Sequence, residues 1–457
     1  MSWQSVVGMF GSKSKLKSAI ARSTTIAIVV VVIIIVAIGG YAAVVLTATS
    51  TSTPSFTSSS SITSSSASSA SSASSASKSI NIGVFAAMSG ADASADGQVL
   101  PAVQIGAAQV NANGGVDIAG TNYTLNIIGV DVTSDASQAP SLAEAALSKT
   151  NFVGAIGSDI SGMSLAIEPI LEQYKVPWIE GGISNSLSAV NSTGNGPQYH
   201  YFFSNSPNVT VAGGFEVKFI QYLNSISPVQ RIAILYENSE YGVGTANSTY
   251  SALAAAGLTP VLYKSYPTPL TAADASSVAT AVKDSNAQII IPISNSISDG
   301  ELLMQNIRAQ GVNAPIFGQG PAFGPDLIPA IGSAANYVMD NDGWFPDLAP
   351  SFAQAFLTKT GSPAEVAAGT AYIQFWILVQ ALKEATAPTA AAVEQSLLTV
   401  NVTSGPAFQM YGNIYFSPLT HRDPIAPLFV AEDINGTYHT VYPSQFATAK
   451  VVWPAPS

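Results

Sequence analysis

Short apolar runs alternate with amphipathic segments from residue 78 to about residue 320. The runs are rich in β-branched residues, as strands buried on both faces of a parallel sheet are. They read INIGVFAA, LNIIGVDV, FVGAIGS and VPWIEGG, then RIAILYE, VLYKSYP, AQIIIPIS and PIFGQG. The segments between them predict helices at residues 98–112, 141–150, 164–174, 211–225, 242–256, 272–285 and 300–310. Two sets of four strands separate near residue 205, so the pattern predicts two open α/β lobes, each with a doubly wound parallel sheet.

The amino-terminal part of the chain has a different pattern. Residues 26–46 are apolar throughout, and at about 1.5 Å per residue a helix of this length crosses a hydrocarbon core of about 30 Å. Basic residues (Lys13, Lys15, Lys17 and Arg22) precede this segment, and none follows until Lys78. The positive-inside rule therefore places residues 1–25 in the cytoplasm and everything after the span outside. We expect a transmembrane anchor or signal in the lipid bilayer of the cell membrane.

The same segment resembles archaeal pilin-type signals, because a basic start leads directly into a long apolar helix. An ordinary cleaved signal has an apolar region of about 7 to 15 residues, which is shorter than this one. The sequence leaves open whether the segment is cleaved or retained. In either case the lobes are expected on the extracellular side.

Residues 47–77 consist almost wholly of Ser, Thr and Ala. Such a segment cannot bury enough apolar surface to offset the entropy of ordering, so it predicts a disordered stalk. Ser/Thr-rich stalks of surface proteins are often glycosylated. N-x-S/T sequons suit an exported glycoprotein, and they occur at Asn122, Asn191, Asn208, Asn247, Asn401 and Asn435.

The composition excludes several functional classes. Charged residues make up 9% of the chain and the formal net charge is -11, so contact with a nucleic-acid backbone is not expected. The chain has no cysteine and only three histidines, His200, His421 and His439. It contains no H-E-x-x-H, no G-x-S-x-G and no P-loop or dinucleotide fingerprint. We therefore expect no enzyme activity, no metal and no cofactor.

Eight segments in order resemble the leucine/isoleucine/valine-binding protein family of ABC transporter solute-binding proteins. They are IGVFAAMSG, QVNANGGV, VDVTSD, SDISGMS, VPWIEGGIS, the adjacent pair RIAILYE and NSEYGVG, and GNIYFSPLTHRDPIAPLFV. The resemblance implies a type I periplasmic-binding fold, in which two lobes joined by three hinge strands close on a ligand. By this resemblance the first lobe comprises residues 78–204 and 335–400, and the second comprises 205–334 and 401–443. Residues 444–457 would form a tail.

The resemblance also implies ligand-binding positions at the carboxyl ends of the strands, where open α/β sheets bind ligands. Ser161 stands where the family uses a hydroxyl for a carboxylate. Gly182 and Ser184 in EGGIS stand where it offers a backbone carbonyl and a hydroxyl. Tyr241 in EYGVG stands where a tyrosine reaches across the cleft. Read without the family, the two serines are helix-cap or turn residues and the tyrosine packs on a helix start.

The sequence departs from the family at positions that decide ligand class. Asp96 stands where the family places an aromatic side chain, and it is either a capping group or a contact for a polar or cationic ligand. The loop PIFGQGPAF offers Gln319 in place of the carboxylate that binds an ammonium, and Ser296 replaces a tyrosine. The nearest acids are Asp299 and Asp326. Gln319, Ser296 and Asn295 suit a neutral amide.

These observations predict an extracytoplasmic subunit of an ABC importer. It would capture an amino acid, an amide or a related small polar nutrient and present it to a permease. The alternatives are a surface sensor or receptor with the same fold and, less favoured, an extracellular hydrolase. A receptor would carry a cytoplasmic signalling domain, whereas residues 1–25 are the part expected in the cytoplasm, so the importer subunit is the preferred interpretation.

Overall fold

The computed structural model describes residues 78–456. The expected cytoplasmic segment, membrane span and stalk, residues 1–77, lie outside the described residues. Among residues 78–456, no helix combines the length and apolar character needed to cross a membrane.

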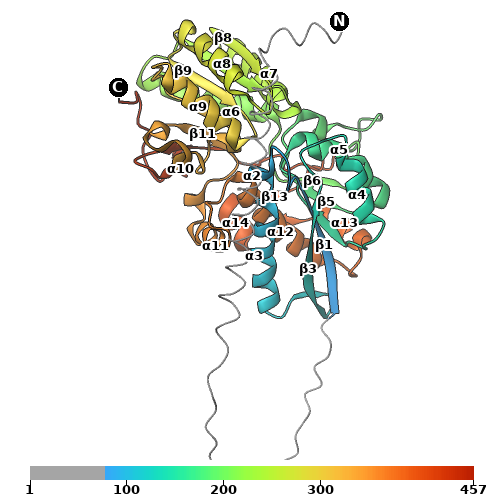
Figure 1. Cartoon of the computed structure of the whole chain (residues 1–457). Helices are drawn as coiled ribbons and strands as arrows, with labels where there is room; N and C mark the ends of the chain where they lie inside the picture. The colour runs from blue at the N-terminus through green and yellow to red at the C-terminus, as the bar shows by residue number, and fades with distance from the viewer. Residues whose placement is uncertain (1–77, 457) are drawn as a thin grey trace, which may run out of the picture. The chain divides into compact units, whose positions relative to one another are not determined.

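The first of two large sheets has six strands in the order β2-β3-β1-β4-β5-β6. The strands from β3 to β6 pair in parallel and β2 pairs antiparallel at one edge. In Figure 1, β1 and β3 lie side by side, as their nine-residue register requires. The strands are β1 Lys78–Ala86, β2 Val116–Ile118, β3 Thr121–Asp131, β4 Gly154–Ile156, β5 Trp178–Glu180 and β6 Phe202–Ser204.

The second sheet has seven strands in the order β15-β14-β11-β10-β9-β7-β8. The strands from β8 to β11 are parallel, and β14 and β15 add an antiparallel edge. The strands are β7 Ile232–Glu237, β8 Leu262–Tyr266, β9 Ile289–Ile293, β10 Phe317–Gln319, β11 Met339–Asp342, β14 Phe429–Asp433 and β15 Tyr438–Tyr442. A separate hairpin pairs β12 Asn401–Val402 with β13 Ile414–Tyr415.

Helices cover both faces of each sheet. On the first sheet, α3 packs over β1 and β3 and against α12, which in turn contacts β2, β4 and β5. The helices of this lobe are α2 Ala93–Asp96, α3 Val99–Ala112, α4 Ala139–Leu147, α5 Ser161–Tyr174, α11 Pro350–Thr360, α12 Val366–Glu384, α13 Ala390–Leu397 and α14 Gly405–Tyr411. Those of the second are α6 Val209–Ile226, α7 Glu240–Ala255, α8 Ala272–Ser285, α9 Ile297–Ala309 and α10 Leu327–Ile331. Short 3-10 turns occur at η3 Asn185–Ser188, η4 Pro321–Phe323, η5 Gly332–Ala335 and η6 Pro346–Leu348.

The polar residues before the second-lobe helices explain where these helices begin. Asn208, Ser239 and Ser296 are N-caps whose side chains accept hydrogen bonds from backbone N–H groups of the first turns of α6, α7 and α9. Each cap satisfies a donor that the helix itself cannot use. The helices therefore start two or three residues earlier than the apolar pattern alone predicted.

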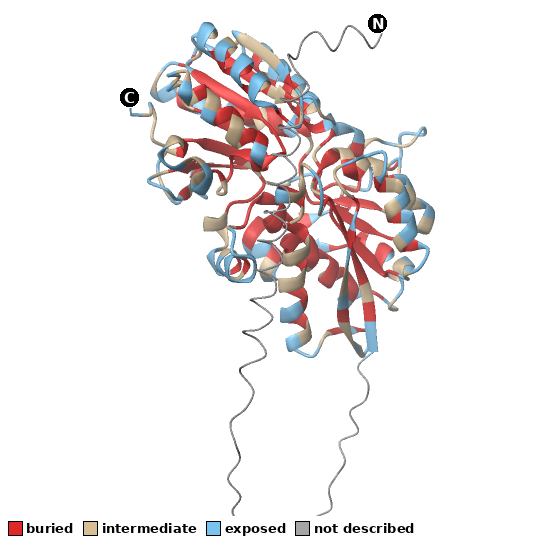
Figure 2. Ribbon diagram, in the orientation of Figure 1, coloured by how far each residue is buried: buried red, intermediate tan, exposed pale blue. Residues whose placement is uncertain are grey.

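The buried apolar residues form a separate core on each face of each sheet. One first-lobe core joins β1 to α3, α12 and α13, and the other lies under α4 and α5. In the second lobe, α8 and α9 cover one face and α6 and α7 the other. Figure 2 shows the buried residues concentrated along the strands and on the inner helix faces. The eight expected strands all form, and the α/β fold with two doubly wound lobes is confirmed.

The lobe boundaries differ from the expected ones at two places. Strand β11 belongs to the second sheet, so this lobe extends to Asp342 and not to residue 334. Residues 401–416 pack in the first-lobe core against α12, through Val402, Met410 and Ile414 among others. Sequence pattern missed both, because β11 buries polar residues and the 401–416 segment is too short to show a period. The tail also packs on the second lobe, where Trp453 Nε1 donates to the carbonyl of Ser227 at 3.2 Å.

Candidate functional site

A cavity lies between the two lobes, which belong to one compact unit. Residues from strand ends of both sheets line it, including Asp159 and Ile183 from the first lobe and Tyr241, Gln319 and Asp342 from the second. The chain crosses between the sheets three times near this cavity, after β6, after β11 and before β14. This is the position at which open α/β sheets bind ligands.

The lobes contact each other across the cleft in this structure. Ser184 Oγ of the first lobe donates to Glu240 Oε1 at the start of α7, at 2.8 Å. The backbone N–H of Asp326 donates to the Glu365 carboxylate on the opposite lobe. The free volume of the cavity is about 40 Å³, room for about three water molecules. The structure is therefore a closed arrangement of the two lobes.

Tyr241 is the predicted residue that the structure places most clearly at the cavity. It is the second residue of α7 and is 6% exposed. Its hydroxyl lies against Gly320, where a β-carbon would stand 2.6 Å from Tyr241 Oη. Gly320 also has φ +88°, a backbone conformation that favours glycine. A side chain at position 320 would therefore displace the tyrosine from the cavity.

Of two further predicted ligand-binding residues, Gln319 lines the cavity and Ser296 does not. Gln319, the last residue of β10, lines the cavity and is 2% exposed. Asn295 also lines it. Ser296 does not, because its hydroxyl caps α9 by accepting from the N–H of Asp299 at 3.3 Å.

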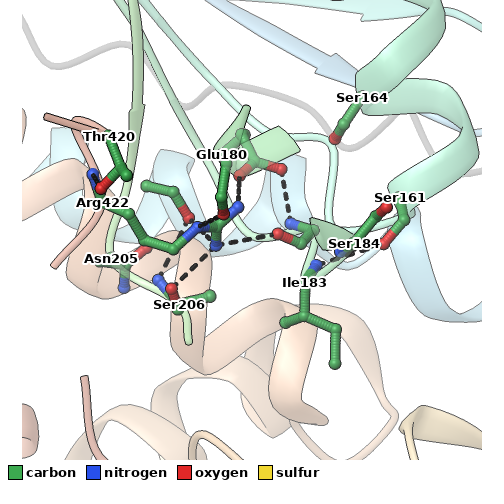
Figure 3. Close-up of polar contacts among 12 residues, drawn as sticks. Ser161, Ser164, Glu180, Ile183, Ser184, Asn205, Ser206, Thr420 and Arg422 are labelled. Atoms are coloured by element: carbon green, nitrogen blue, oxygen red, sulfur yellow. Dashed lines mark hydrogen bonds and ion pairs between the residues drawn. The ribbon is translucent and has the colours of Figure 1, made fainter. Parts of the chain in front are cut away.

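The positions expected to hold a carboxylate are occupied by internal hydrogen bonds, as Figure 3 shows. Ser161 Oγ accepts from the N–H groups of Ile183 and Ser184, both at 3.2 Å. The Gly182 carbonyl accepts from Arg422, and the Gly182 N–H donates to Glu180 Oε2 at 2.6 Å. None of Ser161, Gly182 and Ser184 is among the residues that line the cavity. These groups shape the loop behind the cavity, and the N–H groups of Gly182, Ile183 and Ser184 are already used within it.

Arg422 holds this loop in place, and sequence reasoning did not select it. Its guanidinium lies at 3.5 Å from Glu180 Oε1, and the two side chains are 5% and 0% exposed (Figure 3). Burial raises the pKa of Glu180 to about 7, although the positive charge of Arg422 opposes the shift. The guanidinium also donates to the carbonyls of Gly182, Ser206 and Pro207 at 3.1, 2.8 and 3.2 Å, and to the hydroxyls of Ser188 and Ser204 at 2.8 Å. It therefore ties the crossing before β14 to β5, β6 and the crossing after β6.

Asp96 lies away from the cavity and is fully buried. Its carboxylate accepts from the N–H of Ala87 at 2.5 Å, from Ser158 Oγ at 2.6 Å and from the N–H of Asp159 at 2.7 Å. Burial raises its pKa, and these hydrogen bonds oppose the shift. Asp96 thus joins the loops after β1 and β4, and it is neither a cap of α2, α3 or α5 nor a lining residue of the cavity.

The acids at the cavity are Asp159 and Asp342, which the sequence analysis did not single out. Asp159 precedes α5, and Asp342 ends β11 beside Asn341. The acids that it did name lie elsewhere: Asp299 accepts from Thr268 Oγ1 and the N–H of Leu270, and Asp326 is not a lining residue. The available signal was VMDNDG, where an apolar start leads into acidic and amide residues. The sequence does not show that this segment forms β11, between β10 and β14, so its acids could not be predicted to lie at the cleft.

Comparison with known proteins supports the fold and the family. Residues 79–437 match the family described as periplasmic binding protein. The Leu/Ile/Val-binding protein homolog 7 of Brucella abortus (strain 2308) is 26% identical over 372 residues, which cover 77% of this chain and 88% of that protein. Homolog 8 of Brucella melitensis is 26% identical over 338 residues, 69% of this chain and 80% of that protein.

Solved structures show the same architecture. A leucine-binding protein from Thermotoga maritima superposes with a TM-score of 0.65 at 19% identity, covering 79% of this chain and 97% of its own. The second structure is a branched-chain amino acid transporter substrate-binding protein from Streptococcus pneumoniae, in complex with isoleucine. It superposes with a TM-score of 0.66 at 18% identity, covering 79% of this chain and 98% of its own. At these identities the likeness concerns the fold. With the match of residues 79–437, it establishes that this chain belongs to the periplasmic binding protein family.

Proposed function

We propose that this protein is the extracytoplasmic solute-binding subunit of an ABC importer for a small polar nutrient, an amino acid, an amide or a related compound. One observation carries the proposal: a cavity enclosed by strand ends of two lobes, with three chain crossings beside it. The relatives named as amino acid-binding and transporter substrate-binding proteins support the same function.

The mechanism that follows is closure about the three crossings. The open form binds ligand, the second lobe then adds Tyr241 and Gln319, and the closed form is the one that the permease recognises. Cross-lobe contacts such as Ser184 to Glu240 stabilise the closed form. Ligand adds the remaining free energy that shifts the equilibrium towards closure.

The proposal includes anchoring by residues 26–46 in the cell membrane, with the lobes outside. The support is the apolar stretch and the basic residues that precede it. The archaeal-type signal and glycosylation at the sequons belong to the same proposal. A surface sensor with the same fold is the second candidate, and it differs in having no permease partner.

A ligand screen tests the proposal. Thermal shifts with amino acids, amides, short peptides and carboxylates should give one clear class of stabilisers. Small-angle scattering with that class should show compaction of the protein. Uptake of the same compound by cells that lack the protein should be lost and then restored by its gene. Stabilisation without compaction would contradict the closure mechanism, and unchanged uptake would favour the sensor.

A further inference from the structure

The cavity between the lobes has an acidic lining. Asp159 reaches it from the first lobe and Asp342 from the second, and both keep partial exposure to the cleft. Among the described residues that line the cavity, none is Lys, Arg or His. The nearest strongly basic group, Arg422, is bound to Glu180 and to the loop carbonyls behind the cavity. A ligand in this cavity therefore meets two carboxyl groups and no positive charge.

Several polar atoms at the same cavity have no hydrogen-bond partner in residues 78–456. They include both side-chain atoms of Asn341, Nε2 of Gln319 and Oδ2 of Asp342. Asn341 is 3% exposed and Gln319 is 2% exposed. The amides of Gln319 and Asn341 nevertheless face the Glu216 carboxyl, whose pKa they lower by side-chain hydrogen bonding. Buried polar groups are normally paired, so the remaining two atoms, Asn341 Oδ1 and Asp342 Oδ2, indicate a bound group that supplies donors.

The unpaired atoms differ from those that would hold an amino acid carboxylate. The N–H groups of Ile183 and Ser184 already donate to Ser161 Oγ, and Ser184 Oγ donates to Glu240. A ligand carboxylate would face Asp159 and Asp342 without a cation to compensate, which is strongly unfavourable in a site closed to water. An N–H-bearing cation would instead pair with these two carboxyl groups.

We infer that the ligand is a small organic cation with N–H donors and a neutral oxygen acceptor, with its cation between Asp159 and Asp342. The acceptor then binds the hydroxyl of Tyr241, which lines the same cavity. A primary ammonium, amidinium or guanidinium fits, whereas a quaternary ammonium lacks the N–H groups that Asp342 Oδ2 requires. This inference rests on the proposed function and narrows its ligand class to amino amides and similar cations.

Metal binding does not explain the same residues. No group of three or more His, Asp or Glu side chains in residues 78–456 is arranged to hold a metal ion. Two carboxyl groups from opposite lobes that line one cavity suit a ligand that carries its own donors. The site therefore selects an organic cation.

The electrostatics of the closed cleft support this assignment. Burial raises the pKa of Asp159 well above its usual value, and Asp342, Asp96 and Glu180 raise it further. Burial and Asp340 raise the pKa of Asp342 in the same way. The other titratable groups that feel the Asp342 charge are Tyr241, Glu365 and Tyr411. A cation bound between the two carboxyl groups favours their ionised forms, so its binding shifts their proton equilibrium towards release.

A matched set of small compounds tests the inference on the full-length protein. Glycinamide carries a cation and a neutral amide, acetamide only the amide, glycine a cation with a carboxylate, and acetate only the carboxylate. Titration calorimetry at pH 7 should give glycinamide at least tenfold tighter binding than the other three. Repeated in two buffers of different ionisation enthalpy, it should show release of up to one proton per glycinamide.

Variants locate the cation. Asp159→Asn and Asp342→Asn should each weaken glycinamide at least tenfold and change acetamide less than threefold. Asp423→Asn, a buried carboxyl outside the cavity, should change neither. Tighter binding of glycine or acetate, or proton uptake when glycinamide binds, would overturn the inference and leave the solute-binding role intact. The comparison of the four compounds does not depend on the variants, so it decides the matter if the variants fail to fold. If no compound in the wider thermal-shift screen stabilises the protein, the proposed function itself is wrong.

Discussion

Replacement of Arg422 by methionine tests whether this one side chain holds the crossings around the cleft. Methionine keeps much of the aliphatic volume and removes the guanidinium. The change leaves Glu180 buried at 0% exposure without its cation. It also leaves the carbonyls of Gly182, Ser206 and Pro207 without this donor.

The expected loss of folding free energy follows from these contacts. Removing one partner of a buried ion pair costs about 3–5 kcal/mol, because the other charge stays buried and unpaired. Burial already raises the pKa of Glu180 to about 7. At pH 8 Glu180 is ionised in the wild type, so we expect the full loss of about 3–5 kcal/mol. At pH 5 it is protonated with or without Arg422, so the loss should fall to about 1–3 kcal/mol from the unpaired carbonyls.

Urea unfolding at the two pH values measures this difference. Arg231→Met is the matched control, since Arg231 also donates to a backbone carbonyl, that of Asn286 at 2.9 Å, but is exposed. It should cost less than about 1 kcal/mol at either pH. Adding Glu180→Gln to Arg422→Met should recover part of the loss at pH 8. A loss below about 1 kcal/mol for Arg422→Met, or one that does not depend on pH, would refute the reasoning.

Three further predictions concern the ligand, pH and the domain boundary. Tyr241→Ala should weaken the best ligand by about 1–3 kcal/mol, the range for a buried anchor, as measured by calorimetry; unchanged affinity for every ligand would remove Tyr241 from the site. Glu180 and Glu216 have folded pKa values of about 7 and 8, above their usual 4.5. The folded state binds these two protons more tightly than the unfolded state does. The stability that the two groups contribute is therefore fully present below about pH 4.5 and is lost as pH rises towards 8. The urea midpoint should then be higher at pH 5 than at pH 8, and the reverse order would contradict this. A fragment beginning at Lys78 should unfold cooperatively by circular dichroism, and an insoluble fragment would show that the boundary is wrong.

Local pattern in the sequence was sufficient for the eight predicted strands, the seven predicted helices and the fold class. The run AQIIIPIS predicts β9, because a strand buried on both faces needs continuous apolar residues. The helix expected at residues 272–285 forms with those bounds as α8. The order of short motifs also pointed to the family that residues 79–437 match. These features depend on neighbours within a few residues, which a sequence displays directly.

The chemistry of the cleft was decided by tertiary structure. Ser161 and Gly182 have the residue types expected at a ligand site, yet their hydrogen bonds are taken by Ile183, Ser184 and Arg422. Arg422 lies 242 residues beyond Glu180, its ion-pair partner, and no local pattern encodes such a pair. Asp159 and Asp342 come together only because the chain returns to the cleft from β11. Which polar groups remain free for a ligand depends on partners far apart in the chain, and the fold alone determines those partners.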